Sequence, residues 1–204
     1  GKGDGVFINT SAIGVVEHPC KIHPTAVEPG DAVLVSGDLG RHGTAMLIAR
    51  EELGFRCNLD SDLAPLHTTV LALLNAGINL HCLRDLTRGG LASAINEIAS
   101  AAKCSIELDE KAIPLHSQVH SACELLGLDP LTMANEGRMV VICPASEADA
   151  ALTLLQQQDP TAARVGEVKR ESDARQRQAV VVRNGLGVLR PLDLGQGEQL
   201  PRIC

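Results

Sequence analysis

The run Arg138-Met-Val-Val-Ile-Cys143 constrains the fold most, because all of its side chains after the first are apolar. A strand with one face in water alternates polar and apolar residues, so an unbroken apolar run is typical of a strand that is buried inside a sheet. We therefore expect residues 138–143 to form a central strand, in a sheet that helices cover.

Strands and helices interleave on both sides of this run, without a strict strand–helix–strand repeat. The interleaving predicts an α+β fold, an α/β sandwich with a mixed sheet covered by helices. The pair Asn184-Gly185 predicts a tight hairpin near the end of the chain. The other expected strands are 6–16, 31–36, 80–83, 105–108, 164–168, 179–183 and 186–189. The expected helices follow Gly43, Asp62 (as a cap), Gly90, Pro114 and Ser146 (as a cap).

Charge and composition exclude several classes of function. The formal charge is −7, and the chain has two Phe and no Trp or Tyr, which argues against binding to nucleic acid. The seven cysteines are odd in number and include no Cys-x-x-Cys pair, so neither a secreted disulfide framework nor a zinc knuckle is expected. Reduced thiols and the lack of a signal peptide or a membrane-length apolar run favour the cytoplasm.

The stretch Gly37-Asp-Leu-Gly-Arg-His-Gly43 joins a predicted strand to a predicted helix. Gly37, Gly40 and Gly43 would allow backbone N–H groups to approach an anion at the helix N-terminus. The spacing matches neither the phosphate-loop motif nor the dinucleotide fingerprint, so a tight turn is the alternative. His42 could donate to a phosphate or a carboxylate, or it could simply be exposed.

A second stretch that joins a predicted strand to a predicted helix is Leu83-Arg-Asp-Leu-Thr-Arg-Gly-Gly-Leu91. Asp85 and Thr87 are placed either to cap the following helix or to bind a ligand. Arg88 adds a forked donor for phosphate or carboxylate. Because two arginines before a glycine pair exceed what a turn needs, we favour a functional site here.

The third stretch, Asn135-Glu136-Gly137, directly precedes the buried strand. A carboxylate at the mouth of a central strand is partly desolvated, which suits Glu136 to accept a proton as a general base. The alternative is an ordinary polar turn with a solvated Glu136.

No metal site is predicted. His116 and His120 have helical spacing, but the Glu of the zincin pattern does not follow the first histidine, so we expect surface residues. His18 and His23 flank Cys20 in a connector, and this grouping is interpreted as incidental.

The chain ends Pro201-Arg202-Ile203-Cys204. Arg202 lies two residues from the terminal sulfur, where its charge favours the thiolate. Gly195 and Gly197 predict a mobile approach to this cysteine. By themselves these residues also fit a frayed terminus with an incidental thiol.

Taken together, the three glycine-bearing stretches resemble the C-terminal domain shared by aminoimidazole ribonucleotide synthetase, selenophosphate synthetase and the HypE family of nickel–iron hydrogenase maturation factors. The ending Pro201-Arg202-Ile203-Cys204 resembles the HypE family specifically. The resemblance covers nearly the whole chain.

The resemblance implies a carbamoyl dehydratase that uses ATP and Mg²⁺. It implies that Cys204 receives a carbamoyl group from the partner HypF. Dehydration to a thiocyanate then supplies cyanide to the HypC–HypD iron complex. We expect Cys204 and Glu136 to be catalytic, and Pro201, Arg202 and Ile203 to form the tail that carries the thiol. The residues expected on the substrate and nucleotide side are Gly37, Gly40, His42, Gly43, Asp85, Thr87, Arg88 and Asn135.

The resemblance also implies a division of the chain. Residues 1–28 would be the last strand and connector of a missing N-terminal ATP-binding domain, 29–190 the C-terminal α/β domain, and 191–204 a flexible tail. The missing domain would hold most ATP and Mg²⁺ ligands and the homodimer interface, so we expect poor ATP turnover from this chain alone. Two alternatives stay open: a docking module whose tail binds maturation partners or a metal, and a sister ATP-dependent synthetase.

Overall fold

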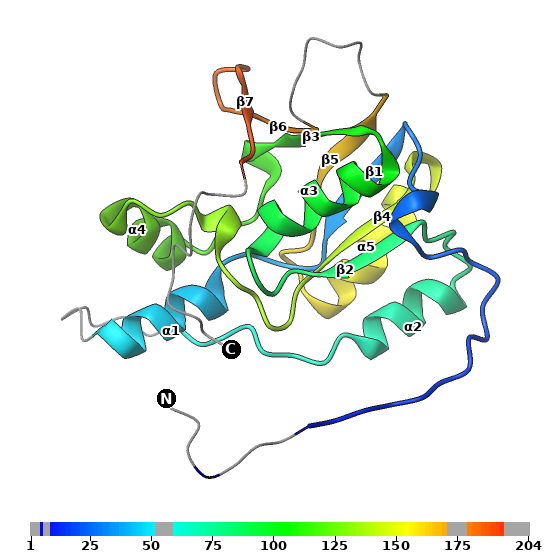
Figure 1. Ribbon diagram of the computed structural model, residues 1–204, viewed down its shortest axis with the longest axis horizontal. Helices are drawn as coiled ribbons and strands as arrows, with labels where there is room; N and C mark the ends of the chain where they lie inside the picture. The colour runs from blue at the N-terminus through cyan, green and yellow to red at the C-terminus, as the bar shows by residue number, and fades with distance from the viewer. Residues whose placement is uncertain (1–4, 6–8, 52–58, 171–178, 194–204) are drawn as a thin grey trace.

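The computed structural model describes residue 5 and residues 9–51, 59–170 and 179–193. Within these residues the chain forms a seven-stranded sheet in the order β2-β4-β1-β5-β3-β6-β7. Neighbouring strands are antiparallel except β3 and β6, which are parallel. Helices cover the sheet (Figure 1), so the predicted mixed sheet covered by helices is confirmed.

The strands are β1 (Asp31–Val35), β2 (Cys82–Asp85), β3 (Ser105–Asp109), β4 (Met139–Pro144), β5 (Ala163–Lys169), β6 (Val180–Arg183) and β7 (Leu189–Pro191). The α-helices are α1 (Arg41–Glu51), α2 (His67–Asn75), α3 (Gly90–Ala102), α4 (Ser117–Leu126) and α5 (Ala148–Gln158). Four short 3₁₀ turns are η1 (Pro24–Ala26), η2 (Glu110–Ala112), η3 (Pro130–Thr132) and η4 (Ala145–Glu147).

Strand β4 lies inside the sheet, between β2 and β1, as its apolar sequence predicts. Every residue from Met139 to Cys143 is buried. Strand β1 is buried along its whole length and pairs with β4 on one side and β5 on the other. These two strands bring the residues that follow β1 next to those that precede β4.

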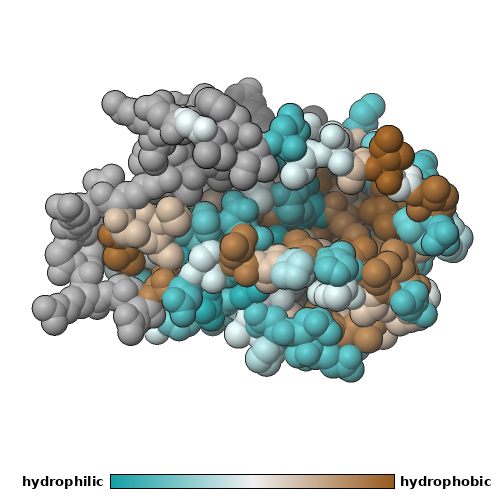
Figure 2. Space-filling model, turned by 90° about the horizontal axis from the view of Figure 1, so that it is seen from below, coloured by the Kyte–Doolittle hydropathy of each residue, from teal (hydrophilic) through white to brown (hydrophobic). Residues whose placement is uncertain are grey.

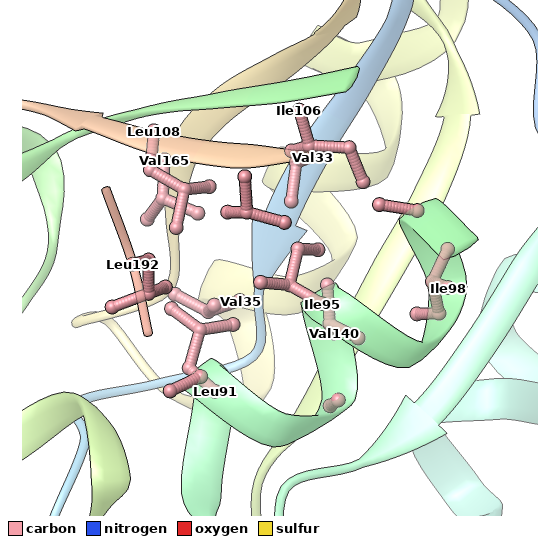
Figure 3. Close-up of a cluster of buried hydrophobic side chains, with 14 of the residues drawn as sticks. Val33, Val35, Leu91, Ile95, Ile98, Ile106, Leu108, Val140, Val165 and Leu192 are labelled. Atoms are coloured by element: carbon pink, nitrogen blue, oxygen red, sulfur yellow. The ribbon is translucent and has the colours of Figure 1, made fainter. Parts of the chain in front are cut away.

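The larger core lies between α3 and one face of the sheet (Figure 3). Leu91, Ile95 and Ile98 form the buried stripe that their helical spacing predicts. They pack against alternate residues of the strands, including Val33 and Val35 of β1. Helix α3 is thereby held in place, and its N-terminus lies at the end of the sheet where β1 ends.

Helices α2 and α5 cover the other face. Ala32 and Leu34 of β1 point to this side because successive side chains of a strand alternate between the two faces. They pack with Leu73 of α2 and Leu155 of α5. The sheet is therefore the middle layer of three.

The predicted strand at 6–16 is wrong for the residues that the structure describes there. Residues 9–16 form neither helix nor strand, and Ile13, Val15 and Val16 are exposed. Figure 2 views the molecule from this side and shows apolar side chains among polar ones. Apolar residues of high strand propensity form a strand only beside a hydrogen-bonding partner.

Several predicted boundaries shift. Helix α1 starts at Arg41, before Gly43, and α4 starts at Ser117, where the His116 side chain caps it. Helix α2 starts at His67, so Asp62 does not cap it. Helix α5 follows the turn η4, and Ser146 lies inside that turn.

The terminal hairpin exists, but its turn is longer than the tight turn predicted. The Asn184 side chain accepts hydrogen bonds from the N–H groups of Leu186 and Val188, at 3.0 and 2.9 Å. Strand β7 therefore starts at Leu189. Among the described residues, none of the helices has the length and apolar character needed to span a lipid bilayer.

Candidate functional site

The three glycine-bearing stretches meet at one end of the sheet. Residues 37–40 join β1 to α1, residues 86–89 join β2 to α3, and residues 134–138 lead into β4. Strands β2, β4 and β1 are neighbours, so their connections lie side by side. The sequence predicted each stretch separately, and the structure brings all three together.

Asn135 joins these stretches. Its side chain is 1% exposed. Its amide oxygen accepts a hydrogen bond from the Gly40 N–H at 2.7 Å, and its amide nitrogen donates to the carbonyls of Leu86 and Met133, at 3.0 and 3.1 Å. Asn135 therefore fixes the relative positions of the loops through hydrogen bonds to their backbones.

Asp62 makes a second connection, which the sequence analysis missed. Its Oδ1 accepts from the His42 N–H at 3.0 Å, and its Oδ2 accepts from the N–H groups of Glu136 and Gly137, both at 3.2 Å. This buried carboxylate therefore holds His42 and Glu136 on its two sides. The signal in the sequence was an aspartate after a serine, which we interpreted as the cap of the next helix.

These bonds bear on whether the first loop cradles an anion. The N–H groups of Gly40 and His42 donate to Asn135 and Asp62, and the Gly43 N–H donates to the Ala134 carbonyl at 2.9 Å. Three donors of the loop are thus engaged within the protein. This arrangement favours the interpretation of the loop as a structural turn, with side chains rather than backbone facing a ligand.

Gly37 and Gly90 are among the glycines of these stretches whose close contacts leave no room for a side chain. A Cβ atom on Gly37 would lie 2.6 Å from Nε of Arg138. Gly90 has φ +56, and a Cβ there would lie 2.5 and 2.6 Å from the carbonyl oxygens of Met133 and Leu131. Helix α3 approaches the third stretch closely because this position carries no side chain.

Beneath the loops lies a buried ionic network. The Arg138 guanidinium donates to Asp38 at 2.8 Å and forms an ion pair with Asp159 at 2.9 Å. Asp38 is 2% exposed and also pairs with Arg41 at 2.7 Å. Burial alone would raise the pKa of Asp159, but hydrogen bonds from Thr161 and the charge of Arg138 outweigh it, and the pKa lies below its usual value. The network anchors both the start of α1 and the start of β4.

His42 and Glu136 provide the side chains on either side of Asp62. The His42 ring contacts the Ser61 hydroxyl, with 2.9 Å between Nδ1 and Oγ. Glu136 is half-buried at the mouth of β4. An imidazole and a carboxylate held this way are suited to proton transfer and to binding a polar substrate.

The second stretch presents polar side chains beside this pair. Thr87 donates to Asp85 at 2.8 Å, and Asp85 is half-exposed. Helix α3 begins after Gly89 without a hydrogen bond from a capping side chain, so neither Asp85 nor Thr87 has the capping role that we considered. Arg88 lies in the same exposed connection.

His116 and His120, outside the site, each contact a residue of their own helix. His116 accepts from the Gln118 N–H at 3.3 Å, and His120 lies 3.3 Å from Glu124. The Cys20 thiol contacts the Ile78 carbonyl. Within residues 9–51, 59–170 and 179–193, the structure brings together no group of three or more His, Cys, Asp or Glu side chains that could hold a metal ion.

The tail leaves the domain at Leu192. This side chain is buried in the core beside α3 (Figure 3), and its carbonyl accepts a hydrogen bond from Asn96 at 2.9 Å. Pro201, Arg202, Ile203 and Cys204 lie outside the described residues.

Comparison with known proteins begins with a family model. Residues 28–177 match the C-terminal domain of AIR synthase related proteins. The carbamoyl dehydratase HypE of Cupriavidus necator is 48% identical over the whole of this chain, which spans 58% of that protein. The HypE of Azotobacter vinelandii is 44% identical, and this chain covers 59% of it. The chain thus spans about three fifths of the curated relatives that it matches.

Solved structures agree with these matches. A crystal structure of hydrogenase maturation protein HypE has a TM-score of 0.84 at 41% identity, over 90% of this chain and 58% of that one. HypE in complex with ATP has a TM-score of 0.82 at 41% identity, over 90% and 55%. A HypE–HypF complex has a TM-score of 0.78 at 36% identity, over 84% and 55%.

Proposed function

The chain belongs to the family of AIR synthase related proteins and matches the C-terminal part of HypE, and on that premise we propose that it is part of an ATP-dependent carbamoyl dehydratase of hydrogenase maturation. In this proposal Cys204 carries a carbamoyl group, which is dehydrated to a thiocyanate. The thiocyanate is the source of the cyanide ligands of the hydrogenase iron. The meeting of the three glycine-bearing stretches around Asn135 and Asp62 carries the proposal, because it sets Glu136 and His42 at one place.

The proposed reaction removes one oxygen and two protons from the carbamoyl group. Oxygen is a poor leaving group from an amide carbon, and transfer of the γ-phosphoryl group of ATP to this oxygen converts it into phosphate. The C–O bond then breaks while the nitrogen loses its protons and a C≡N bond forms. The products are the thiocyanate on Cys204, ADP and phosphate, and a base is needed for the protons on nitrogen.

We assign the base to Glu136. It is half-buried, and its backbone N–H is fixed by Asp62 at 3.2 Å. A fixed main chain limits the positions of the carboxylate relative to an incoming substrate, which is a large part of what a general base requires. We assign His42 to orient the carbamoyl or phosphoryl oxygens, because Asp62 holds its main chain and Ser61 its ring.

In this proposal, few groups of this chain contact the nucleotide. The loop donors at Gly40, His42 and Gly43 are engaged internally, and Asp85, Thr87 and Arg88 remain as the polar groups beside the pair. The described residues do not fit a Mg²⁺ site, since no three of their ligating side chains gather. We assign Mg²⁺ and most phosphate contacts to the part of the full-length relatives that this chain does not span.

HypF is the proposed carbamoyl donor. A crystal structure contains HypE together with HypF, and that HypE is 36% identical to this chain. The HypC–HypD complex is the proposed acceptor of cyanide, and a homodimer is proposed for the full-length protein. In this proposal the C-terminal tail binds more than one protein in turn.

Mass spectrometry of the terminal peptide tests the proposal. The chain is incubated with HypF, carbamoyl phosphate and ATP, and the peptide that contains Cys204 should gain the mass of one carbamoyl group. In this proposal HypF acts on the terminal thiol, which this chain contains. The Cys204→Ala variant should gain nothing while keeping its fold by circular dichroism.

The dehydration step is tested in the full-length protein. Glu136→Gln should load normally but accumulate the carbamoyl form without losing water. If the unaltered chain bound HypF but its terminal peptide gained no mass in the loading experiment, the result would instead support a docking module. Normal dehydration by Glu136→Gln would remove Glu136 from the role of base.

A further inference from the structure

The loop that carries Asp62 continues with three exposed apolar residues, Leu63, Ala64 and Pro65. Leu63 is 74% exposed. A run of three consecutive apolar residues on the surface of a folded domain is unusual and generally has a function. None of the roles proposed above uses this run, although it directly follows a residue that holds the candidate site together.

The structure places this loop against the third glycine-bearing stretch. A Cβ atom on Gly137 would collide with the Asp62 carbonyl oxygen and would lie 2.7 Å from the Ala64 nitrogen. Leu63 is the residue between these two atoms, so its main chain lies against Gly137, next to Glu136. The absence of a side chain at position 137 is what allows the apolar loop to lie so close to the site.

Hydrogen bonds hold Leu63 in this position. Its N–H donates to the Ser61 hydroxyl at 3.2 Å, and the same hydroxyl lies 2.9 Å from Nδ1 of His42. The Asp62 carboxylate accepts from the N–H groups of His42 and Glu136. Leu63 is therefore an exposed apolar side chain on a main chain that is fixed relative to both residues.

The proposed reaction passes through a group that water can destroy. Phosphoryl transfer to the carbamoyl oxygen gives a phosphorylated imidate, in which the carbon bears sulfur, a C=N–H group and an oxygen bonded to phosphorus. Loss of phosphate together with the remaining nitrogen proton leaves the C≡N bond of the thiocyanate. Addition of water at the carbon also releases phosphate, but it returns the carbamoyl group, so one ATP is consumed without product. Exclusion of water is a recognised way in which active sites protect such intermediates.

We propose that Leu63, continued by Ala64 and Pro65, is an apolar wall that keeps water from the phosphorylated carbamoyl group. Its side chain offers no hydrogen bond to a water molecule, and its fixed main chain keeps it beside Glu136 and His42. Leu63 is thus a specificity-determining residue, which favours elimination over hydrolysis. The inference rests on the proposed function and concerns the fate of the intermediate, whereas Glu136 removes the protons.

The number of ATP molecules consumed per thiocyanate formed tests the wall. The full-length protein is carbamoylated by HypF, separated from HypF and then supplied with ATP. ADP is measured by chromatography, and thiocyanate by the mass of the protein. We expect about one ATP per thiocyanate for the unaltered protein and about three or more for Leu63→Ser, because water then competes with elimination.

Isotopically labelled water reports directly on the entry of solvent. Elimination takes no oxygen from the solvent, whereas attack of water at carbon or phosphorus places one solvent oxygen in the carbamoyl group or in the phosphate. In water enriched in a heavy oxygen isotope, Leu63→Ser should therefore give labelled phosphate or a labelled carbamoyl group. Slower chemistry or a lower stability alone would not transfer solvent oxygen to these products.

Leu71→Ser is the matched control. Leu71 is also exposed, at 53%, but it belongs to helix α2 and not to the loop beside Glu136. The control removes the same apolar side chain from the surface and should leave the ratio at about one ATP per thiocyanate. Leu63→Met keeps an apolar side chain at the wall and should also keep the ratio low.

Four results would overturn the wall while leaving the proposed function intact. They are an unchanged ratio in Leu63→Ser, an equal rise in Leu71→Ser, a rise in Leu63→Met as large as in Leu63→Ser, and a rise without solvent oxygen in the products. A lower Tm of Leu63→Ser with an unchanged ratio would identify Leu63 as a packing contact only. If the unaltered protein formed no thiocyanate at all, the proposed function would fall and this inference with it, so the two failures are distinguishable.

Discussion

A buried aspartate lies near each end of strand β1, Asp31 at its first residue and Asp38 in the connection after its last, but the two carboxylates have different partners. At the site end, Asp38 pairs with the guanidinium groups of Arg138 and Arg41, at 2.8 and 2.7 Å. At the far end, Asp31 lies 2.7 Å from the His81 ring and accepts from the Glu28 N–H at 2.8 Å. A guanidinium keeps its charge at all ordinary pH values, whereas an imidazole can become neutral. The site end is therefore held by permanent charges, and the far end by a contact that tolerates loss of charge.

The largest expected effect tests this difference directly. Asp38→Ala should lower the free energy of unfolding by about 3–5 kcal/mol, because the guanidinium groups of the buried Arg138 and of Arg41 lose their shared carboxylate and only Asp159 still pairs with Arg138. Asp31→Ala should cost only about 1–2 kcal/mol, since it removes hydrogen bonds rather than the partner of a permanent charge. Urea unfolding of the two variants makes the comparison. Equal losses at both ends would contradict it.

A second prediction concerns Asp62, which connects the site end to the loop before α2. Asp62→Ala should lower the free energy of unfolding by about 2–4 kcal/mol, because three backbone N–H groups lose their acceptor. In the full-length protein it should also slow dehydration without changing loading by HypF, since Glu136 and His42 are no longer aligned. The measurements are urea unfolding and single-turnover mass spectrometry.

The control for Asp62 is its amide. Asp62→Asn keeps one acceptor oxygen, so both losses should be smaller than those of Asp62→Ala. If Asp62→Asn and Asp62→Ala slowed loading and dehydration equally, a general loss of structure would explain the effect better than positioning.

A third prediction compares two glycines with positive φ. Gly90→Ala places a Cβ against the carbonyls of Met133 and Leu131 at the site end and should cost about 2–3 kcal/mol. Gly127→Ala has similar backbone strain but open space around the Cβ, and should cost about 1 kcal/mol. Thermal unfolding separates the two values. A similar cost at both positions would mean that contact with the third stretch is not what restricts Gly90.

The smallest expected effect is a loss of folding stability at alkaline pH, and it arises at the far end of β1. Burial, together with the charges of Glu147 and Asp31, raises the pKa of the Cys143 thiol to about 11. A raised pKa in the folded state means that stability is lost as pH rises above the unfolded value, here between about pH 9 and 11. Relative to Cys143→Val, the wild-type chain should lose about 1 kcal/mol on going from pH 8 to pH 10. Parallel curves for the two proteins over this range would contradict the prediction.

Strongly patterned elements could be predicted from sequence. The apolar run of β4 and the stripe of α3 each define one element by their own spacing, and both lie where we expected them. The strand expected at 6–16 failed because Val15 and Val16 carry strand propensity, and propensity does not supply a hydrogen-bonding neighbour. A local pattern predicts a strand correctly only where the fold also supplies a neighbouring strand.

The candidate site shows the same difference between what a local motif predicts and what only the fold determines. Asn135 and Glu136 were identified from a motif, but the bonds of Asn135 to Gly40 and Leu86 join segments far apart in the chain. Asp62 was misinterpreted because an aspartate ahead of an apolar stretch is typical of a helix cap. Its true acceptor role depends on which backbone N–H groups the fold brings to it, and a single sequence contains no record of that.

The pairing of β1 has a consequence for how the chain is made. Its neighbours are β4 and β5, with Ala32 opposite Cys143 and Glu167. During translation, the residues between β1 and the first of these neighbours therefore take on the order of ten seconds to synthesise. Until then the strand, in which every residue after Asp31 is apolar, has no neighbouring strand to pair with. The connection after β1, which belongs to the candidate site, is thus synthesised well before the strands that order it, which makes the nascent chain a natural client for chaperones.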